Sequence, residues 1–519
     1  MKKIHKIILG TLFVFFATAC ERDFLDVNTD PNATTEAIPG ALMTEAMLGY
    51  SQNNLNTLNP DGQAYIQYHK PVVVLTGPDT YIVAPIGNNN FWNAVYSGIL
   101  TNVRLPEIEA AEAGNNNVVA QLKIFQAMVY LTAADRWGEI PFTEANDVEN
   151  LNPSFDEPTV IYNGIIALID EALALVDLTN QQEPFTIVNS DPLFNGDMER
   201  WQRFANSLKL RVLMRISSVE DVSAQISALL TSGVPFVEDN SQNVEFRYFA
   251  DRTNQNFDFA TFDNFTNLNS YQLDGGIRRH QRWRRGANGL VDLLNTLGDP
   301  RRFSYFDRDL SFETTPPPAD PETPVDFFDR TAPLVGSPNG ASAQPDPEDR
   351  CYTSLFFIRQ DKSDEWLTAA EHNLLAAEAY ARGLAPGGLT AAQTAMEAGI
   401  RASMTQFDGF TYEGKNYEIP DEEIDDYIDA LPELTTLTAD EALEVIQEQQ
   451  YIALFNNGQE AWSNWRRTKV PDLQVPIGAP IITVISRIEL PNDELRANSN
   501  APSVTPRIDE PVYFEKPRQ

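Results

Sequence analysis

Apolar residues recur at helical spacing in several long segments of the chain. Between residues 118 and 136 they fall about 3.6 residues apart and form one broad face, as in an amphipathic helix. Gly138 and Pro141 follow that segment, and both residue types favour the end of a helix. The same spacing predicts further helices at residues 160–175, 201–216, 365–382, 390–404 and 439–455. We therefore expect a mainly α-helical protein.

The middle of the chain has a different character. Residues 234–352 are rich in Asn, Asp, Pro and aromatic residues, and residues 314–324 and 332–347 resemble long irregular loops. Loops of this length in a compact fold are usually functional or mobile. We predict one domain over residues 20–519, with a helical scaffold at about 40–233 and 353–519 and a loop-rich insert at about 234–352.

The N-terminus has the order of a secretory signal. Three lysines precede an apolar run over residues 7–16, and small residues then lead directly to Cys20. This order resembles a bacterial lipobox, so we predict a signal peptide over residues 1–19 and a lipid on the Cys20 sulfur. The alternative is an ordinary signal cleaved near Ala19, with Cys20 left as a spare thiol.

The expected location follows from this leader. We expect no apolar stretch after residue 20 to cross a bilayer, since a spanning helix needs about 20 apolar residues. Acyl chains alone would then hold the protein at the membrane, with the folded part outside it. Glu21, Asp23 and Asp26 resemble the surface-export signal of Bacteroidetes lipoproteins. We predict a lipid-anchored protein of the outer membrane, exposed at the cell surface.

Composition narrows the partners. The formal net charge is −36 over 519 residues, which argues against binding to nucleic acid and against direct docking on anionic lipid. The chain has two cysteines, and one is the proposed lipid site, so Cys351 has no partner for an intramolecular disulfide. The hydrophobic fraction of 42% is enough for a large core that needs no such bond.

The sequence lacks the common signatures of enzymes. It contains no phosphate-binding or dinucleotide-binding glycine motif, no nucleophile elbow and no zinc-binding histidine pair. The four histidines are not spaced as metal ligands, so we expect no metal ion and no cofactor. The acidic run at residues 421–426 lacks the spacing of a calcium loop and is typical of a solvated helix start. Paired carboxylates of a glycosidase remain open, because 74 acidic residues make chance pairs common.

Five segments together resemble one family. They include a Trp-Gly-Glu-Ile-Pro turn, an Ala-Asn-Ser-Leu-Lys-Leu-Arg helix, an Asp-Pro-Arg element and a Trp-Arg-Arg-Thr turn, at residues 131–145, 191–215, 288–302, 446–471 and 486–498. In this order they are similar to the SusD/RagB family of nutrient-binding outer-membrane lipoproteins. The basic run at residues 278–285 departs from the family pattern, which leaves the family's ligand preference in doubt there.

The resemblance implies a fold, a partner and a ligand class. It implies a mainly α SusD-like fold with tetratricopeptide-like helix pairs, although no clean repeat of about 34 residues is present. It implies a protein that captures an oligosaccharide or peptide nutrient and delivers it to a SusC-like TonB-dependent barrel, without being an enzyme. The alternatives are a surface-anchored glycoside hydrolase and a structural surface-layer protein.

Most of the motif residues are predicted to be structural. We expect charge-assisted hydrogen bonds that tie helix ends to loops from Asn206, Lys209, Arg211, Arg301, Arg466 and Arg467. We expect Trp137 and Trp201 in the core. The candidate ligand-binding residues lie elsewhere, in two segments that mix aromatic and polar residues; they are Tyr81, Asn90, Trp92, Tyr271 and Trp283. Tyr81 and Trp283 are predicted to be exposed in loops, whereas Trp92 suits the core equally well.

Overall fold

The computed structural model describes residues 38–515 with several gaps. The gaps are residues 72–76, 84, 148, 180–190, 252, 257–258, 261–272, 275–276, 279–283, 309–332, 341–349 and 413–414. The predicted signal peptide and the predicted lipid site Cys20 precede the described residues, and Tyr271 and Trp283 fall within two of the gaps.

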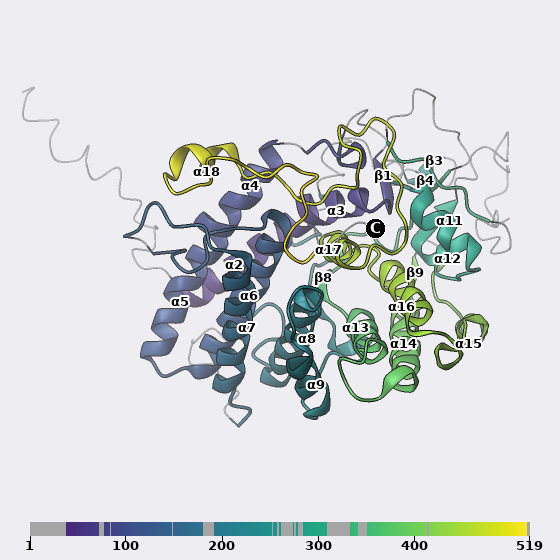
Figure 1. Ribbon diagram of the computed structural model, residues 1–519, viewed down its shortest axis with the longest axis horizontal. Helices are drawn as coiled ribbons and strands as arrows, with labels where there is room; N and C mark the ends of the chain where they lie inside the picture. Colours follow the sequence, from purple (N-terminus) through teal and green to yellow (C-terminus); the bar gives the residue numbers. More distant parts are fainter. Residues whose placement is uncertain are drawn as a thin grey trace, which may run out of the picture.

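Helices make up most of the described chain, as the apolar spacing predicts (Figure 1). The N-terminal helices are α2 (Pro39–Asn53), α3 (Asn59–Tyr65), α4 (Pro85–Asn93), α5 (Leu100–Glu112), α6 (Asn116–Trp137), α7 (Pro158–Leu175), α8 (Met198–Ile216) and α9 (Ser223–Thr231). The later helices are α11 (Asn288–Thr296), α12 (Arg302–Tyr305), α13 (Ala369–Ala381), α14 (Gly388–Thr405), α15 (Asp421–Ala430), α16 (Ala439–Ala453), α17 (Gly458–Thr468) and α18 (Asn492–Ala497). Two π-helical segments, η2 (Asn54–Leu58) and η4 (Ala94–Ile99), join α2 to α3 and α4 to α5.

One predicted helix begins later than the periodicity suggested. We expected a helix from residue 365, but Asp364–Leu367 is a strand, β8, that pairs antiparallel with β2 (Val244–Phe246). Helix α13 begins after Thr368, whose side chain accepts a hydrogen bond from the Glu371 amide at 3.2 Å. This cap fixes the helix start, because it satisfies a backbone N–H that has no partner within the helix.

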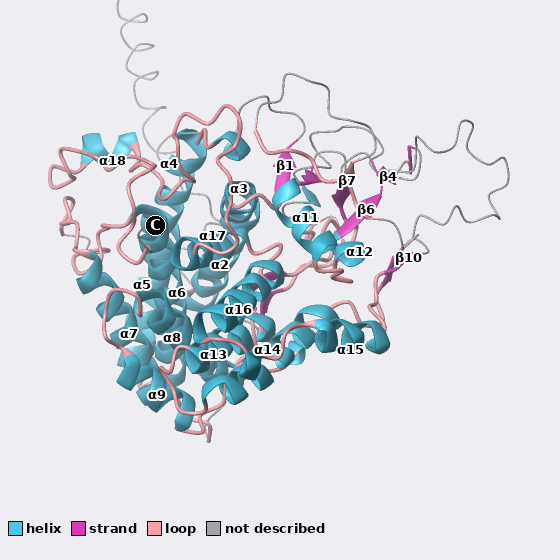
Figure 2. Cartoon of the chain, turned by 45° about the vertical axis from the view of Figure 1, so that its right-hand side comes forward, coloured by secondary structure: helices cyan, strands magenta, loops and turns pink. Residues whose placement is uncertain are grey.

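The remaining strands lie beside the helical array (Figure 2). Four of them form a sheet in the order β1 (His69–Pro71), β5 (Arg284–Gly286), β7 (Cys351–Thr353) and β6 (Phe306–Arg308), with antiparallel neighbours. Two short hairpins complete the described strands, β3 (Leu273–Asp274) with β4 (Ile277–Arg278) and β9 (Thr411–Tyr412) with β10 (Lys415–Asn416). Helices α11 and α12 flank the four-stranded sheet (Figure 2).

Neighbouring helices pack in pairs and share one core. Helix α6 contacts α5, α7 and α8, and α13 contacts α14, α16 and α8. Figure 1 shows these helices side by side across the molecule. Their buried apolar faces belong to one continuous cluster that extends from Met43 to Phe514. The helical array therefore forms a continuous support for the loops that emerge from it.

Helix α7 overturns one expectation. Among the described residues it alone is long and apolar enough to cross a membrane by length and composition, whereas we expected no such stretch after residue 20. Its buried face packs in the array, and its outer face carries Asp170 and Glu171. Lys209 forms an ion pair with Asp170, and Lys123 forms one with Glu171 at 3.0 Å. These contacts are typical of a core helix with one solvent-exposed face.

The crossing of α3 and α17 depends on two glycines. A Cβ on Gly458 would lie 2.1 Å from the Asn59 carbonyl oxygen, and one on Gly62 would lie 2.2 Å from the Gly458 carbonyl oxygen. Both clashes are with backbone, which cannot move aside as a side chain can. The two helices can approach this closely only because neither glycine carries a side chain.

We expect Gly458→Ala to destabilise the protein by roughly 1–3 kcal/mol or more, the usual cost of overpacking a close contact. Gly98→Ala is the matched control, because a Cβ there would meet nothing within 4 Å. The control should change the free energy of unfolding by less than about 1 kcal/mol. Urea unfolding of both variants tests this, and equal stabilities would show that the crossing can relax.

Candidate functional site

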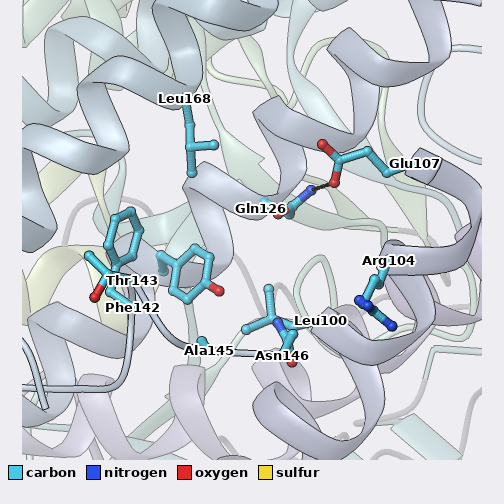
Figure 3. Close-up of a pocket in the computed structure, with 10 residues that line it drawn as sticks. Leu100, Arg104, Glu107, Gln126, Phe142, Thr143, Ala145, Asn146 and Leu168 are labelled. Atoms are coloured by element: carbon cyan, nitrogen blue, oxygen red, sulfur yellow. Dashed lines mark hydrogen bonds between the residues drawn. The ribbon is translucent and has the colours of Figure 1, made fainter. Parts of the chain in front are cut away.

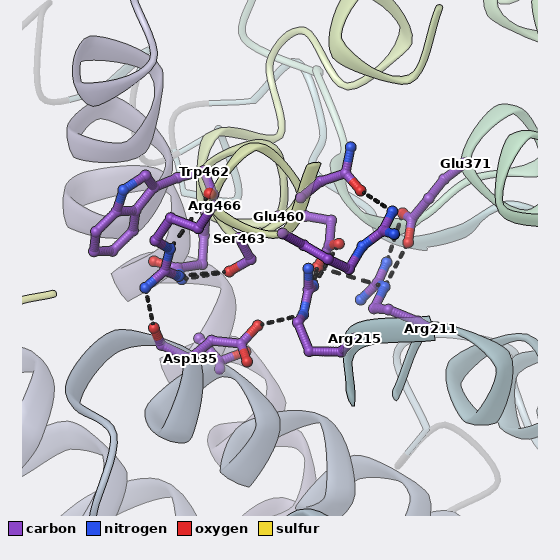
Figure 4. Close-up of polar contacts among 12 residues, drawn as sticks. Asp135, Arg211, Arg215, Glu371, Glu460, Trp462, Ser463 and Arg466 are labelled. Carbon is purple, nitrogen blue, oxygen red and sulfur yellow. Dashed lines mark hydrogen bonds and ion pairs between the residues drawn. The ribbon is translucent and has the colours of Figure 1, made fainter. Parts of the chain in front are cut away.

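The motif arginines are buried in an ionic network between helices (Figure 4). Arg211 on α8 donates to both carboxylate oxygens of Glu371 on α13, at 2.5 and 2.7 Å. Arg215, one turn later, pairs with Glu460 on α17 at 2.5 Å and with Asp135 on α6 at 3.0 Å. Four helices are joined in this way, so the network holds the array together.

The other motif residues have the same structural role. Arg466 donates to the carbonyl oxygens of Asp135 and Ser486 at 2.6 and 2.8 Å, with its guanidinium 3.7 Å from the Trp462 ring centroid. Further ties join Asn206 to the Pro235 carbonyl, Arg301 to Asp299, and Arg467 to Glu378. Trp137 and Trp201 are buried in the core. The prediction that these residues are structural is confirmed.

Tyr81 was predicted to be exposed, and this prediction is wrong. It follows the short 3₁₀ turn η3 (Pro78–Thr80) with a positive φ of 59°, and its side chain is fully buried. Its hydroxyl donates to the Tyr65 carbonyl oxygen at 3.3 Å, and the two rings meet edge to face. The loop turns inward here and places the ring in the core, so Tyr81 cannot serve as an exposed platform.

Trp92 and Asn90 lie on α4, which ends one residue after Trp92. The Trp92 side chain is 4% exposed and packs edge to face on Trp137, while its indole N–H donates to Glu494 at 3.2 Å. Trp92 is therefore a core residue. Asn90 is exposed, so it stays a candidate; the neighbouring Asn88 is buried and accepts a hydrogen bond from the Trp137 indole at 2.9 Å.

A pocket of about 360 Å³ lies at a different place, between α5, α6, α7 and the loop that follows α6 (Figure 3). The pocket is lined by Leu100, Arg104, Glu107, Gln126, Tyr130, Phe142, Thr143, Ala145, Asn146 and Leu168. We call it the α5–α7 pocket. In Figure 3, Phe142 and Thr143 lie on one side of it, and Arg104 and Glu107 lie on the opposite side.

The loop side of the α5–α7 pocket is held firmly. Asp156 accepts hydrogen bonds from the backbone N–H groups of Phe142 and Thr143 at 2.9 and 2.8 Å. The Phe142 ring lies so close to Gly164 on α7 that a Cβ there would be 2.2 Å from it. The same ring meets Tyr130 edge to face, with 4.8 Å between centroids. The aromatic wall is therefore fixed before any ligand arrives.

The helix side of the pocket carries the charges. Glu107 accepts from the Gln126 amide at 2.7 Å and lies 3.5 Å from the Lys123 ammonium, so both of its oxygens are engaged. Burial raises the pKa of Tyr130, which keeps its hydroxyl neutral beside the hydrogen-bonding side chain of Asn146. Arg104 is exposed and has no hydrogen bond or ion pair to any residue that the structure describes.

The described residues contain no group of three or more His, Cys, Asp or Glu side chains placed to hold a metal ion. The acidic run at 421–426 forms the first turns of α15, with Asp421, Glu422 and Glu423 in the first turn. Acidic side chains at this end of a helix interact favourably with its dipole. The run is therefore a helix start, as predicted. The α5–α7 pocket is a cavity on the described surface that could receive a ligand.

Comparison with known proteins identifies the family. A family model described as SusD-like, starch-binding and associating with the outer membrane matches residues 31–491. A SusD homologue from Bacteroides uniformis has a TM-score of 0.70 at 18% identity, covering 92% of this chain and 99% of that one. A SusD/RagB family protein from Bacteroides thetaiotaomicron has a TM-score of 0.69 at 21% identity, covering 92% and 99%.

A third structure adds a ligand to the comparison. It is a chitin-binding SusD homologue from Flavobacterium johnsoniae, with a TM-score of 0.65 at 21% identity, covering 88% of this chain and 94% of that one. No curated protein matches the chain. These identities establish a shared fold, while the family model spans nearly the whole chain. The protein therefore belongs to the SusD-like family of outer-membrane-associated, nutrient-binding proteins.

Proposed function

We propose that this protein captures a glycan at the cell surface and delivers it to a SusC-like TonB-dependent transporter. The observation that carries the proposal is the family match over residues 31–491, a family described as starch-binding and associating with the outer membrane. The chitin-binding relative favours a glycan over a peptide as the nutrient. A capture protein needs a rigid scaffold and a concave patch rather than a catalytic centre, and the helical array can supply the scaffold.

The expected attachment rests on the N-terminal sequence. We propose that lipid on Cys20 holds the mature chain in the outer leaflet, with the folded part beyond the membrane. We propose no nucleic acid among the partners, in keeping with the net charge of −36, and we propose no cofactor or metal ion. The protein would then bind the nutrient without driving its transport, and the energy for uptake would reach the barrel through TonB.

Cys20→Ala should abolish acylation and release the protein from the cell. The alternative reading, cleavage near Ala19 with a free thiol, predicts no change. Metabolic labelling with a fatty acid distinguishes the two, because only a lipidated Cys20 can carry the label. Cys351→Ala is the matched control and should keep both label and attachment; label that persists on the Cys20 variant would refute the anchor.

Two measurements test the function itself. A glycan array and a peptide pool, applied to the mature chain, should show binding to a glycan class and none to peptides. Purification from native membranes in mild detergent should yield the protein together with a TonB-dependent barrel. Repeated recovery of the protein alone would count against delivery to a transporter.

Release of shortened oligosaccharides would instead favour a glycoside hydrolase, and the absence of any ligand and any barrel would favour a surface-layer role.

A further inference from the structure

We propose that the α5–α7 pocket binds a sugar unit that carries a carboxylate, as in a glycan containing uronic acid. This inference goes beyond the proposed function, because capture of a glycan does not require an acidic sugar or this pocket. The candidate residue Asn90 lies on α4, outside the pocket lining. The site is thus a separate one, built from three helices and one loop.

The volume of the pocket suits a short saccharide. Its 360 Å³ lies near the lower end of the range of about 300–1,000 Å³ that small-ligand sites occupy. Such sites combine apolar walls with a few polar groups that fix the orientation of the ligand. The α5–α7 pocket has this composition, with Leu100, Leu168 and Phe142 as apolar residues among its polar ones.

The aromatic wall matches the apolar face of a sugar ring. Phe142 is half-buried, and its position is fixed by Gly164 and Tyr130. A ring that is already fixed loses little conformational freedom when a ligand stacks on it, so more of the contact energy is available for binding. The side-chain amides of Gln126 and Asn146 lie among the same lining residues and can take the hydroxyl groups.

The charged residues around the pocket favour an acidic ligand. Acidic residues outnumber Lys and Arg by 74 to 38 in this chain, yet Arg104 has no carboxylate partner among the described residues. Glu107, one turn away, is paired with Gln126 and Lys123 instead of Arg104. A guanidinium presents its N–H groups in the planar geometry that a carboxylate accepts in pairs. A ligand carboxylate is therefore the group that completes the pocket.

The test compares three probes by calorimetric titration of the mature chain in mild detergent. The probes are a disaccharide of uronic acid, its methyl ester, and a short peptide with a free C-terminal carboxylate. The ester keeps the shape of the sugar and removes its charge. We expect the uronate to bind most tightly, with an affinity that falls as salt is added, because Arg104 is exposed and its attraction is screened.

Three variants locate the binding. Arg104→Gln should weaken uronate binding roughly tenfold to a hundredfold, the value of one charge-assisted contact, and leave the ester unchanged. Arg496→Gln, at an exposed arginine on α18, makes the same charge change outside the pocket and should have no effect. Ala145→Phe places a ring among the lining residues and should weaken both sugars. Thermal melts of each variant verify that the fold is kept.

Several outcomes would overturn the inference. Equal binding of uronate and ester, or unchanged uronate binding in Arg104→Gln, would show that pairing between Arg104 and the ligand carboxylate does not contribute to affinity. Tighter binding of the peptide than of the uronate would show that the pocket prefers a peptide carboxylate to an acidic sugar. If the array finds a neutral glycan whose binding ignores all three variants, the proposed function stands and the pocket assignment alone fails. If no glycan binds at all, both proposals fail together.

Discussion

Replacing Glu378 by glutamine is expected to lower the free energy of unfolding by roughly 3–5 kcal/mol, the usual cost of breaking a buried ion pair from one side. Glu378 on α13 is fully buried and accepts a hydrogen bond from Arg467 on α17 at 2.6 Å. Gln450 on α16 donates to it at 2.9 Å, and Arg382 does so at 3.2 Å. The glutamine keeps the shape but leaves the Arg467 charge buried and unbalanced.

The pH dependence of this variant provides a second signature. Burial alone would raise the pKa of Glu378, but the Arg467 guanidinium and the hydrogen bonds outweigh it and hold the pKa at about 2, below the usual 4.5. A depressed carboxyl pKa stabilises the fold above the unfolded value, and that contribution is lost as pH falls from about 5 towards 2. The contribution is roughly 3 kcal/mol at neutral pH.

The gap in stability between wild type and Glu378→Gln should therefore narrow over that acid range. Burial raises the pKa values of other carboxyls, such as Asp135 and Glu371, so their contribution to the pH dependence of stability has the opposite sign. This contribution is the same in both proteins and cancels when their stabilities are subtracted. Glu444→Gln, at an exposed position on α16, is the control and should stay within about 0.5 kcal/mol of wild type. Urea unfolding at several pH values measures all three. A constant gap would mean that Glu378 does not titrate as proposed.

Helices rich in apolar residues could be predicted from the sequence, whereas a buried helix rich in polar residues could not. Helices α7 and α8 show an apolar face at helical spacing, and α6 is apolar over most of its length although it is buried on nearly every side. Helix α17 is buried along its whole length although it is rich in polar residues. Its polar groups are satisfied by partners distant in sequence, such as Arg215 for Glu460, and these partners are invisible to local patterns.

The candidate site was harder to predict than the fold. The α5–α7 pocket forms only when α5 meets α6 and α7, and α5 contains Pro106, a residue that normally signals a helix end. A useful signal was nevertheless present. Leu100, Arg104 and Glu107 are spaced to share one helix face, which would have grouped them had the helix been recognised. Tyr81 shows the opposite error, because turn residues around it marked a loop but not the direction of its ring.

Replacing Trp201 by alanine should destabilise the protein by roughly 3–5 kcal/mol, because it opens a large cavity in a packed core. Trp201 lies on α8 with no exposed surface and packs edge to face on Phe194 at 5.2 Å. Its indole N–H donates to Asp191 at 2.7 Å. The same carboxylate accepts from the backbone N–H groups of Leu193 and Gly196 at 3.0 Å each, so Trp201 also anchors the turn that leads into α8.

Trp201→Phe separates these two contributions. It keeps most of the buried ring but removes the donor to Asp191, which retains its backbone partners, so we expect a loss nearer to about 1 kcal/mol. Urea unfolding of the two variants gives both values. At temperatures where the alanine variant stays folded, its affinity for a glycan found on the array should match wild type, since Trp201 is remote from solvent. A large loss of affinity without a loss of stability would place Trp201 in a ligand site, contrary to its burial in the core.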